Sequence, residues 1–307
     1  MVLIDLRYKY DKKILNSLEW EKMRILYLDC FSGISGDMTI GALLDAGGDF
    51  SHLESELKKL HIQDEYELKV EKVIKNGISS TKFDVVLKVE QHGDESETRH
   101  HHEDLSDVHH HHHHHGENHD HHHAHHHDGN GHHHHHHHEH RAYKDIVQLI
   151  EAADLPENVK DTSLKLFTKI GEAEGKIHGM PLEEVHFHEV GAVDSIIDIV
   201  GTAILIDQLE IDVIKSAPVP TGSGHIHIDH GVYPVPAPAT LEILKGVPVV
   251  KSDMKAELTT PTGAAFAAVL TSEFSEFPSM KVSHIGYGAG TKTFPNHPNV
   301  LRVVIGE

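Results

Sequence analysis

Residues 100–140 form a histidine-rich tract, with Asp, Glu and Gly interspersed, in the middle of a chain of 307 residues that contains 36 histidines. A segment with so few apolar side chains cannot bury enough surface to offset the conformational entropy that folding removes. We therefore expect a disordered, metal-binding loop at 100–141 between two folded lobes at 23–99 and 142–307, preceded by an N-terminal extension at 1–22.

The start of the chain does not look like a targeting signal. Its first residues, MVLIDLRYKYDKK, contain no apolar core of signal-peptide length. A cleaner pattern begins at Met23, so a start at Met23 and an amphipathic extension packed on the domain are both compatible with the sequence.

Charge and apolar patterning exclude two classes of function. The net charge is −21 at pH 7, and no stripe of Lys and Arg is available to displace counterions from nucleic acid. The longest apolar stretch, 196–209, is interrupted by Asp and Gly and is shorter than the roughly 18 residues of a membrane-spanning helix. A single cysteine, Cys30, excludes an intrachain disulfide. We expect a soluble, cytoplasmic protein with no nucleic-acid or membrane partner.

Periodicity predicts a mixed α/β (α+β) fold of short strands and helices. The first lobe is expected to contain a strand at 24–29, a Gly/Ser turn into a helix that closes at Gly47 and Gly48, a helix at 51–60, and a hairpin around Asn76 and Gly77. The second lobe is expected to contain helices broken near Pro156, a buried apolar helix at 194–209, short strands with proline-rich turns, and a helix within 260–274.

The histidine-rich tract itself indicates a class of metal. Imidazole suits nickel, zinc and copper, and a flexible polyhistidine offers many weak overlapping sites instead of one defined geometry. Metal buffering, a tolerated low-complexity insertion and a purification tag are the three alternatives. Tags are usually terminal and homogeneous, whereas this tract is internal and mixed with acidic residues.

The segment HFHEVGAVDSIIDIVG contains a candidate metal and catalytic cluster. In an extended strand His186 and His188 project to the same side and form a chelating pair. Asp194 and Asp198 lie one helical turn apart on a buried helix, so they repel each other and require cations or donors nearby. In the alternative interpretation, Asp194 caps the helix and Asp198 bonds a neighbouring loop. Glu189 lies between these two pairs.

Two further segments carry candidate ligands. In GSGHIHIDHGVY, His225, His227 and Asp229 face one side of a strand, although a half-exposed strand would show the same alternation. In DCFSGISGDM, Asp29 ends a strand and Asp37 lies in the first turn of a helix. We predict metal or polar substrate ligands there, with helix capping as the alternative for Asp37.

Two helix starts are candidate cofactor-binding sites, because free backbone amides can take a phosphate or carboxylate. Thr260 is the predicted N-cap of a helix whose first residue is Pro261. The turn before Asp37 has no lysine and does not have the spacing of a nucleotide-binding glycine-rich loop. The candidate residues at the two starts are Ser32, Gly33, Ser35, Gly36, Thr260, Thr262 and Gly263.

Taken together, the segments DCFSGISGDM, HFHEVGAVDSIIDIVG, APVPTGSG, HGVYPVPAPAT and ELTTPTGAA resemble the LarC family of nickel insertion proteins, from Met23 to about Gly306. The resemblance implies a nickel chelatase of the lyase class. Such an enzyme inserts Ni(II) into pyridinium-3,5-bisthiocarboxylic acid mononucleotide, forming Ni–S and Ni–C bonds in a reaction that depends on CTP and a divalent cation such as Mg or Mn. The product, the nickel-pincer cofactor, serves lactate racemase and related enzymes.

The resemblance also implies a further C-terminal domain associated with nucleotide binding, which family members commonly have and which we expect to be absent from this chain. A separately translated partner or a shifted reading frame could supply it. Because a carbon–metal bond requires loss of a ring proton, we predict Glu189 or Asp194 as the general base. The predicted metal ligands are Asp29, Asp37, His186, His188, Asp198, His225 and His227.

The alternative function is nickel storage or delivery, in which the tract binds the metal and the folded part docks onto a recipient. Deleting residues 100–140 distinguishes the two. A chelatase keeps a tight stoichiometric site, whereas a store loses nearly all of its nickel.

Overall fold

The computed structural model describes residues 23–88, 141–187, 193–228 and 231–307. All of them belong to one compact unit, and the residues of the second unit, Val89–His137, are not among those described. The predicted N-terminal extension and nearly all of the predicted histidine-rich loop therefore lie outside the described residues.

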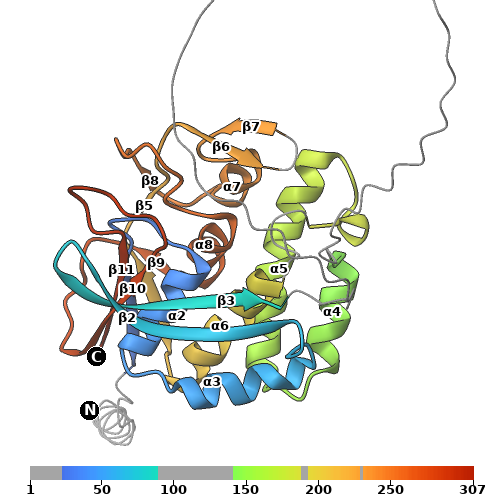
Figure 1. Cartoon of the computed structure of the whole chain (residues 1–307), viewed down its shortest axis with the longest axis horizontal. Coiled ribbons are helices and arrows are strands. Elements are labelled where there is room, and N and C mark those ends of the chain that lie inside the picture. Colours follow the sequence, from blue (N-terminus) through green and yellow to red (C-terminus); the bar gives the residue numbers. More distant parts are fainter. Residues whose placement is uncertain (1–22, 89–140, 188–192, 229–230) are drawn as a thin grey trace, which may run out of the picture. The chain divides into compact units, whose positions relative to one another are not determined.

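A seven-stranded sheet, in the order β2-β3-β10-β11-β1-β4-β9, organises the described chain (Figure 1). Its strands are β1 (Ile25–Asp29), β2 (Tyr66–Lys75), β3 (Ile78–Leu87), β4 (Val213–Ser216), β9 (Glu273–Phe274), β10 (Val282–Ala289) and β11 (Val300–Gly306). β1 is parallel to β4 and antiparallel to β11. Strands from both sides of the tract are neighbours in this sheet, so the two predicted lobes share it. The predicted mixed α/β class is confirmed.

The hairpin of β2 and β3 forms where the sequence predicts it. Asn76 and Gly77 both have positive φ, 47° and 85°, as a two-residue turn with the twist of the flanking strands requires. The turn sets Lys75 opposite Ile78 and places the middle of β3 beside the start of α2.

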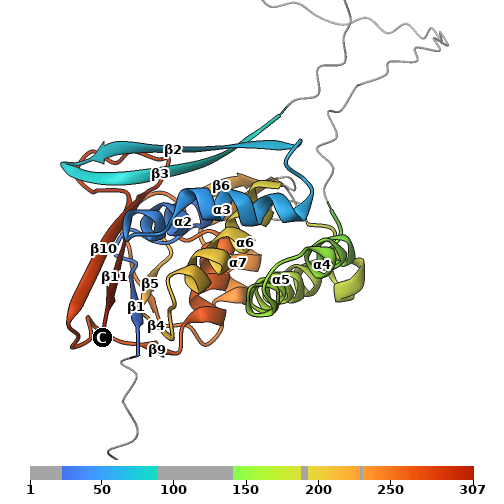
Figure 2. The ribbon, with the colours of Figure 1, turned by 90° about the horizontal axis from the view of Figure 1, so that it is seen from below.

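Five helices pack in two layers beside the sheet (Figure 2). They are α2 (Gly36–Asp45), α3 (Phe50–Leu57), α4 (Tyr143–Ala152), α5 (Glu157–His178) and α6 (Val193–Gln208). α6 contacts α2 on one side and α5 on the other, and most of its residues are buried, as predicted for the apolar helix. Within the described ranges, no helix is long and apolar enough to cross a membrane.

Glycines on β10 let α2 approach the sheet closely. A Cβ on Gly286 or Gly288 would overlap backbone atoms of α2, at Ala42 and Met38 respectively. Because these two residues have no side chain, α2 packs directly on the backbone of β10. This close packing sets the distance of α2 from the sheet and therefore the position of the N-terminus of α2.

Short elements complete the described fold, and all but η1 lie in the second half of the chain. They are the helices α7 (Pro238–Ile243) and α8 (Pro261–Ala265), the π-helix η3 (Phe266–Leu270), the 3-10 helices η1 (Lys58–Leu60) and η2 (Leu182–Glu184), and the paired strands β5 (Val219–Pro220) with β8 (Val249–Val250) and β6 (His225–Ile228) with β7 (Gly231–Pro234). α8 begins as predicted, because the Thr260 hydroxyl accepts a hydrogen bond from the Gly263 amide at 3.2 Å.

The residues that flank the undescribed stretch 89–140 meet at one point of the fold. The Lys88 amide donates to the Glu65 carbonyl at 2.9 Å, and the Arg141 guanidinium donates to the Glu65 carboxylate at 2.6 Å. The chain therefore leaves and re-enters the folded unit at the same place.

Candidate functional site

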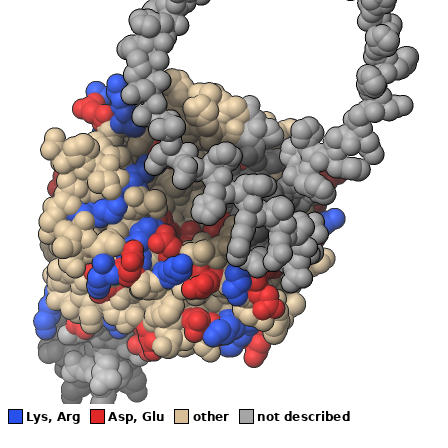
Figure 3. Space-filling model, in the orientation of Figure 1, with Lys and Arg blue, Asp and Glu red and all other residues tan. Residues whose placement is uncertain are grey.

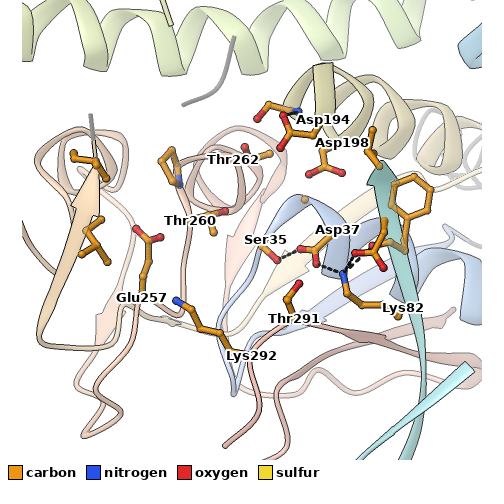
Figure 4. Close-up of a pocket in the computed structure, with 18 of the residues that line it drawn as sticks. Ser35, Asp37, Lys82, Asp194, Asp198, Glu257, Thr260, Thr262, Thr291 and Lys292 are labelled. Carbon is orange, nitrogen blue, oxygen red and sulfur yellow. Dashed lines mark hydrogen bonds and ion pairs between the residues drawn. The ribbon is translucent and has the colours of Figure 1, made fainter. Parts of the chain in front are cut away.

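A polar cavity of about 700 Å³ lies where α2, β3, α6, β6 and the segment before α8 come together. Its lining includes most of the described residues that the sequence analysis singled out (Figure 4). These are Ser35, Gly36, Asp37, Asp194, Asp198, His225, His227, Thr260 and Thr262. The pocket is therefore the place at which separate motifs converge.

One wall of the pocket is an ion-pair network centred on Lys82. Its ammonium lies 2.9 Å from Asp37 and 2.6 Å from Asp84, and its side chain is only 9% exposed. Asp37 also accepts a hydrogen bond of 2.5 Å from the Ser35 hydroxyl. Burial by itself lowers the pKa of Lys82, but the two carboxylates outweigh it, so the pKa is raised. Lys82 remains charged and is already committed to protein partners.

A second acidic pair, Asp194 and Asp198, extends from α6 toward the same space (Figure 4). Asp194 lies inside the first turn of α6 and accepts a hydrogen bond of 2.8 Å from the adjacent Ser195 amide. An N-cap would instead accept from an amide two or three residues further on, so this bond is not the one that the capping interpretation predicts. Burial raises the pKa of Asp194, and Asp37 adds to the increase. Burial also raises the pKa of Asp198 well above its usual value, and the charges of Asp37 and Asp194 raise it further.

Asp198 lacks the partner that a buried carboxyl normally has. Its Oδ1 atom is shielded from solvent and has no hydrogen bond among the described residues. Gly36 makes room for the carboxyl group, since a Cβ there would overlap it. The contact between α2 and α6 thus holds the Asp198 carboxyl group at the pocket without giving its Oδ1 atom a hydrogen bond. This lowers the stability of the fold unless a bound proton or a ligand supplies the missing interaction.

The opposite wall carries hydroxyl groups and a second lysine. Thr260 and Thr262 come from the start of α8, and Thr291 and Lys292 from the loop after β10. This loop is held by its backbone: Lys75 donates to the carbonyls of Thr291 and Lys292, each at 3.3 Å, and Asn299 donates to Lys292 at 2.9 Å. The Lys292 side chain lies on the side of the pocket that also carries Glu257 (Figure 4).

The strand β6 forms a third wall. His225 and His227 are exposed, Ile226 and Ile228 are half-buried, and all four line the pocket. The alternation matches the prediction, and two imidazoles are available at the cavity.

The structure places two other predicted ligands, Asp29 and His186, away from this pocket. Asp29 accepts a hydrogen bond from Arg302 Nε at 2.7 Å and does not line the cavity. His186 is exposed, pairs through its backbone with Ala142, and alternates with the buried Phe187 as an extended segment predicts. His188, Glu189 and Asp229 lie outside the described residues.

The remaining candidates for cofactor binding have structural contacts. Ser32 is buried and donates to the Pro298 carbonyl at 2.5 Å, while a Cβ on Gly33 or Gly263 would overlap a neighbouring carbonyl, that of Leu258 or Ile34 respectively. These contacts join the turn before α2 to the segment before α8. Both helix starts that line the pocket are thereby fixed to each other.

A nucleoside triphosphate does not fit the described lining. In the turn before α2, outside the lining itself, the amides of Gly33 and Ile34 donate to the carbonyls of Cys30 and Leu258 at 2.8 and 3.0 Å, so this turn does not offer them to phosphate. The carboxylates of the acidic wall would repel four negative charges. Cys30 also supplies no ligand, because burial raises the pKa of its thiol to about 12.

Metal ligands do not gather into one site in the described part of the chain. No group of three or more His, Cys, Asp and Glu side chains in these residues is arranged to hold a metal ion. Asp37, Asp198, His225 and His227 share the pocket but approach it from different walls. The predicted ligand set stays a prediction.

Sequence reasoning missed six polar residues of the pocket: Lys82, Asp84, Ser195, Glu257, Thr291 and Lys292. Lys82 and Asp84 flank the fully buried Phe83 on β3. This pattern was a usable signal, because charged side chains next to a core residue of a strand need a partner on the opposite face of that strand. Thr291 and Lys292 follow the Gly-rich segment GYGAG, which the sequence alone identifies only as a turn or strand.

Charges of both signs are interspersed over the described part of the face seen in Figure 3. This face therefore does not present a field of a single sign to a partner. The functional signal lies in the pocket and not in a charged surface.

Comparison with known proteins gives the family. The family model for nickel insertion proteins matches residues 26–307. Proteins named pyridinium-3,5-bisthiocarboxylic acid mononucleotide nickel insertion protein are 52% identical over 285 residues in Geobacillus kaustophilus, 45% over 281 in Staphylococcus epidermidis and 45% over 285 in Clostridium kluyveri.

These alignments cover 92 to 93% of this chain but only 59 to 62% of the relatives, so the chain spans about 60% of their length. No solved structure matches it significantly. The family model spans nearly the whole chain and the pocket lies entirely inside the matched region, so the chain belongs to the nickel insertion protein family.

Proposed function

We propose that this chain takes part in inserting nickel into pyridinium-3,5-bisthiocarboxylic acid mononucleotide, and that the pocket between α2, β3, α6 and β6 binds this substrate. The names of the relatives support the reaction. The observation that supports this site is the cavity of about 700 Å³, whose lining brings together carboxylates, imidazoles, hydroxyls and two ammonium groups. Its size lies within the range of about 300–1,000 Å³ typical of small-molecule sites.

The reaction requires a proton acceptor at the pocket. For nickel to bond the ring carbon between the two thiocarboxylates, the C–H bond must break, its electron pair must pass to the metal, and its proton must pass to a base. Asp194 lines the pocket, and Glu189 precedes it in the sequence, so both stay candidates for this base. Exchanging Glu189 for Gln with unchanged nickel binding and insertion would remove Glu189 from this role.

Nickel is a substrate of the reaction. His225 and His227 are the described imidazoles closest to the proposed reaction, since both line the pocket. His186 lies outside it, and we propose that His186 and His188 receive the incoming ion while the histidine-rich tract keeps nickel locally concentrated.

Further elements of the function come from the family resemblance. We assign the requirement for CTP and for Mg or Mn to the part of the longer relatives that this chain does not span, because the described pocket does not fit a triphosphate. A lactate racemase-type apoenzyme would receive the product. Metal insertion of this kind belongs to the lyase class.

Nickel titration tests the proposal against storage or delivery. Calorimetry compares the full chain, a variant lacking 100–140, and that variant with His186 and His188 both changed to Ala. One tight site that survives the deletion and is lost in the double variant supports a chelating centre in the folded part. Loss of all binding with the tract supports storage.

An insertion assay completes the test. The chain is supplied with nickel and the thiolated mononucleotide, with and without CTP, Mg and the C-terminal part of a longer relative. The proposal requires nickel-pincer product in at least one of these mixtures. A complete set of mixtures without product contradicts it.

A further inference from the structure

The two positive charges that line the pocket have different roles. Lys82 is buried and pairs with Asp37 and Asp84 at 2.9 and 2.6 Å, so its charge is already neutralised. Lys292 is exposed, and its backbone is fixed by hydrogen bonds from Lys75 and Asn299. Lys292 is therefore the lining cation positioned to meet an anionic group of a ligand.

Hydroxyl groups line the pocket between Lys292 and the acidic residues of α6 (Figure 4). Thr291 precedes Lys292 on the fixed loop, and Thr260 and Thr262 line the pocket from the start of α8. A phosphate monoester accepts hydrogen bonds from an ammonium group and from hydroxyls, and its charge makes these bonds stronger than neutral ones. Glu257 also lines this region and would oppose an anion placed next to it, which favours the Thr291 side of Lys292.

The other end of the pocket carries carboxyl groups and therefore favours a cationic group of a ligand. Asp194 and Asp198 project from α6, and Oδ1 of Asp198 has no hydrogen-bond partner among the described residues. Asp37 lies between these two residues and Thr291 (Figure 4), and its charge is paired with Lys82 at 2.9 Å. A cationic ring and sugar hydroxyls provide what this wall lacks, a positive charge and hydrogen-bond donors. Carboxylates accept hydrogen bonds from ribose hydroxyls in many nucleotide sites.

We propose that the pocket binds the mononucleotide in one orientation, with its phosphate at Lys292 and Thr291 and its ribosyl-pyridinium part against Asp194 and Asp198. This inference rests on the proposed function.

Truncating the ligand and the protein together tests this orientation. The full chain is titrated with nicotinate mononucleotide, a pyridinium mononucleotide without sulfur, and with the matching nucleoside that lacks the phosphate. Lys292→Met should weaken binding of the mononucleotide about tenfold to a hundredfold, as expected for loss of a charged hydrogen bond, and leave the nucleoside unaffected. Lys292→Arg should retain most of the difference between the two probes.

Two further variants make the test specific. Asp198→Asn should weaken both probes by the same factor, because the acidic wall does not contact the phosphate. Lys144→Met, on the exposed side of α4, should change neither affinity. Thermal unfolding midpoints close to that of the unmodified chain show that the variants are folded.

The outcomes separate the orientation from the function. Equal losses for both probes in Lys292→Met, or no loss for either, would overturn the orientation while leaving substrate binding in this pocket intact. If the unmodified chain binds neither pyridinium probe, the pocket does not take a pyridinium mononucleotide and the proposed function fails with it.

Discussion

Asp198→Asn should stabilise the fold at neutral and alkaline pH but not in acid. The native pKa of Asp198 is raised well above its usual value by burial, and by Asp37 and Asp194. The folded state therefore binds its proton more tightly than the unfolded state, where the pKa is about 3.9. Stability is lost as pH rises from that value through the native pKa. Asn removes this loss because it does not ionise.

The magnitude follows from the environment of the carboxyl group. Oδ1 of Asp198 is shielded from solvent and has no partner in the described part of the chain. Leaving a buried polar group unsatisfied costs about 1–3 kcal/mol, and more when the group is charged. We expect Asn to raise the free energy of unfolding by about 1–3 kcal/mol at pH 8. Near pH 4 the difference should be close to zero.

Urea unfolding at pH 4, 6 and 8 measures this difference, with a chelator present so that nickel does not stabilise either protein. Asp161→Asn is the control, because Asp161 forms an exposed ion pair with Lys165 on α5. A difference for Asp198→Asn that does not vary with pH, or a loss of stability at pH 8, would show that the native carboxylate is ionised and paired, and would refute the reasoning.

Three other perturbations test the walls of the pocket. Lys82→Met should lower the free energy of unfolding by about 3–5 kcal/mol, because it leaves Asp37 and Asp84 without their shared cation. Lys82→Arg keeps the charge and should lower the free energy of unfolding less. Equal effects of the two variants in chemical denaturation would argue against a role for the charge. Gly263→Ala should lower the free energy of unfolding by about 1–3 kcal/mol or more, because the added Cβ would overlap the Ile34 carbonyl. An unchanged midpoint in urea unfolding would contradict this close contact. Cys30 should react with a thiol reagent at pH 7.5 only after unfolding, because burial raises the pKa of its thiol to about 12. If the native chain is labelled as fast as the unfolded chain, the thiol is accessible in the folded state.

Local patterns in the sequence predict much of this fold. The Asn76-Gly77 turn, the buried helix α6 and the Thr260 cap each depend on a few adjacent residues, and the structure has all three. The spacing of Asp194 and Asp198 likewise places both at the pocket.

Contacts between distant segments are not predictable in this way. Asp29 has a carboxylate at a strand end, as metal ligands often do, but its partner Arg302 lies 273 residues away. Lys82 and Lys292 reach the pocket only because β3 pairs with β10, which joins segments from opposite sides of the tract. The periodicity of a short stretch of sequence does not predict such a pairing of distant strands.

The meeting of both flanks of the tract at Glu65 has a consequence for how this protein can vary. When the ends of an insertion are already held together by the fold, lengthening it changes only the entropy of closing a loop, and a doubling of loop length costs about 0.6 kcal/mol. The number of histidines between Lys88 and Arg141 can therefore grow or shrink with little effect on the stability of the folded unit. The length of this insertion and the stability of the folded unit can thus be selected independently in this chain.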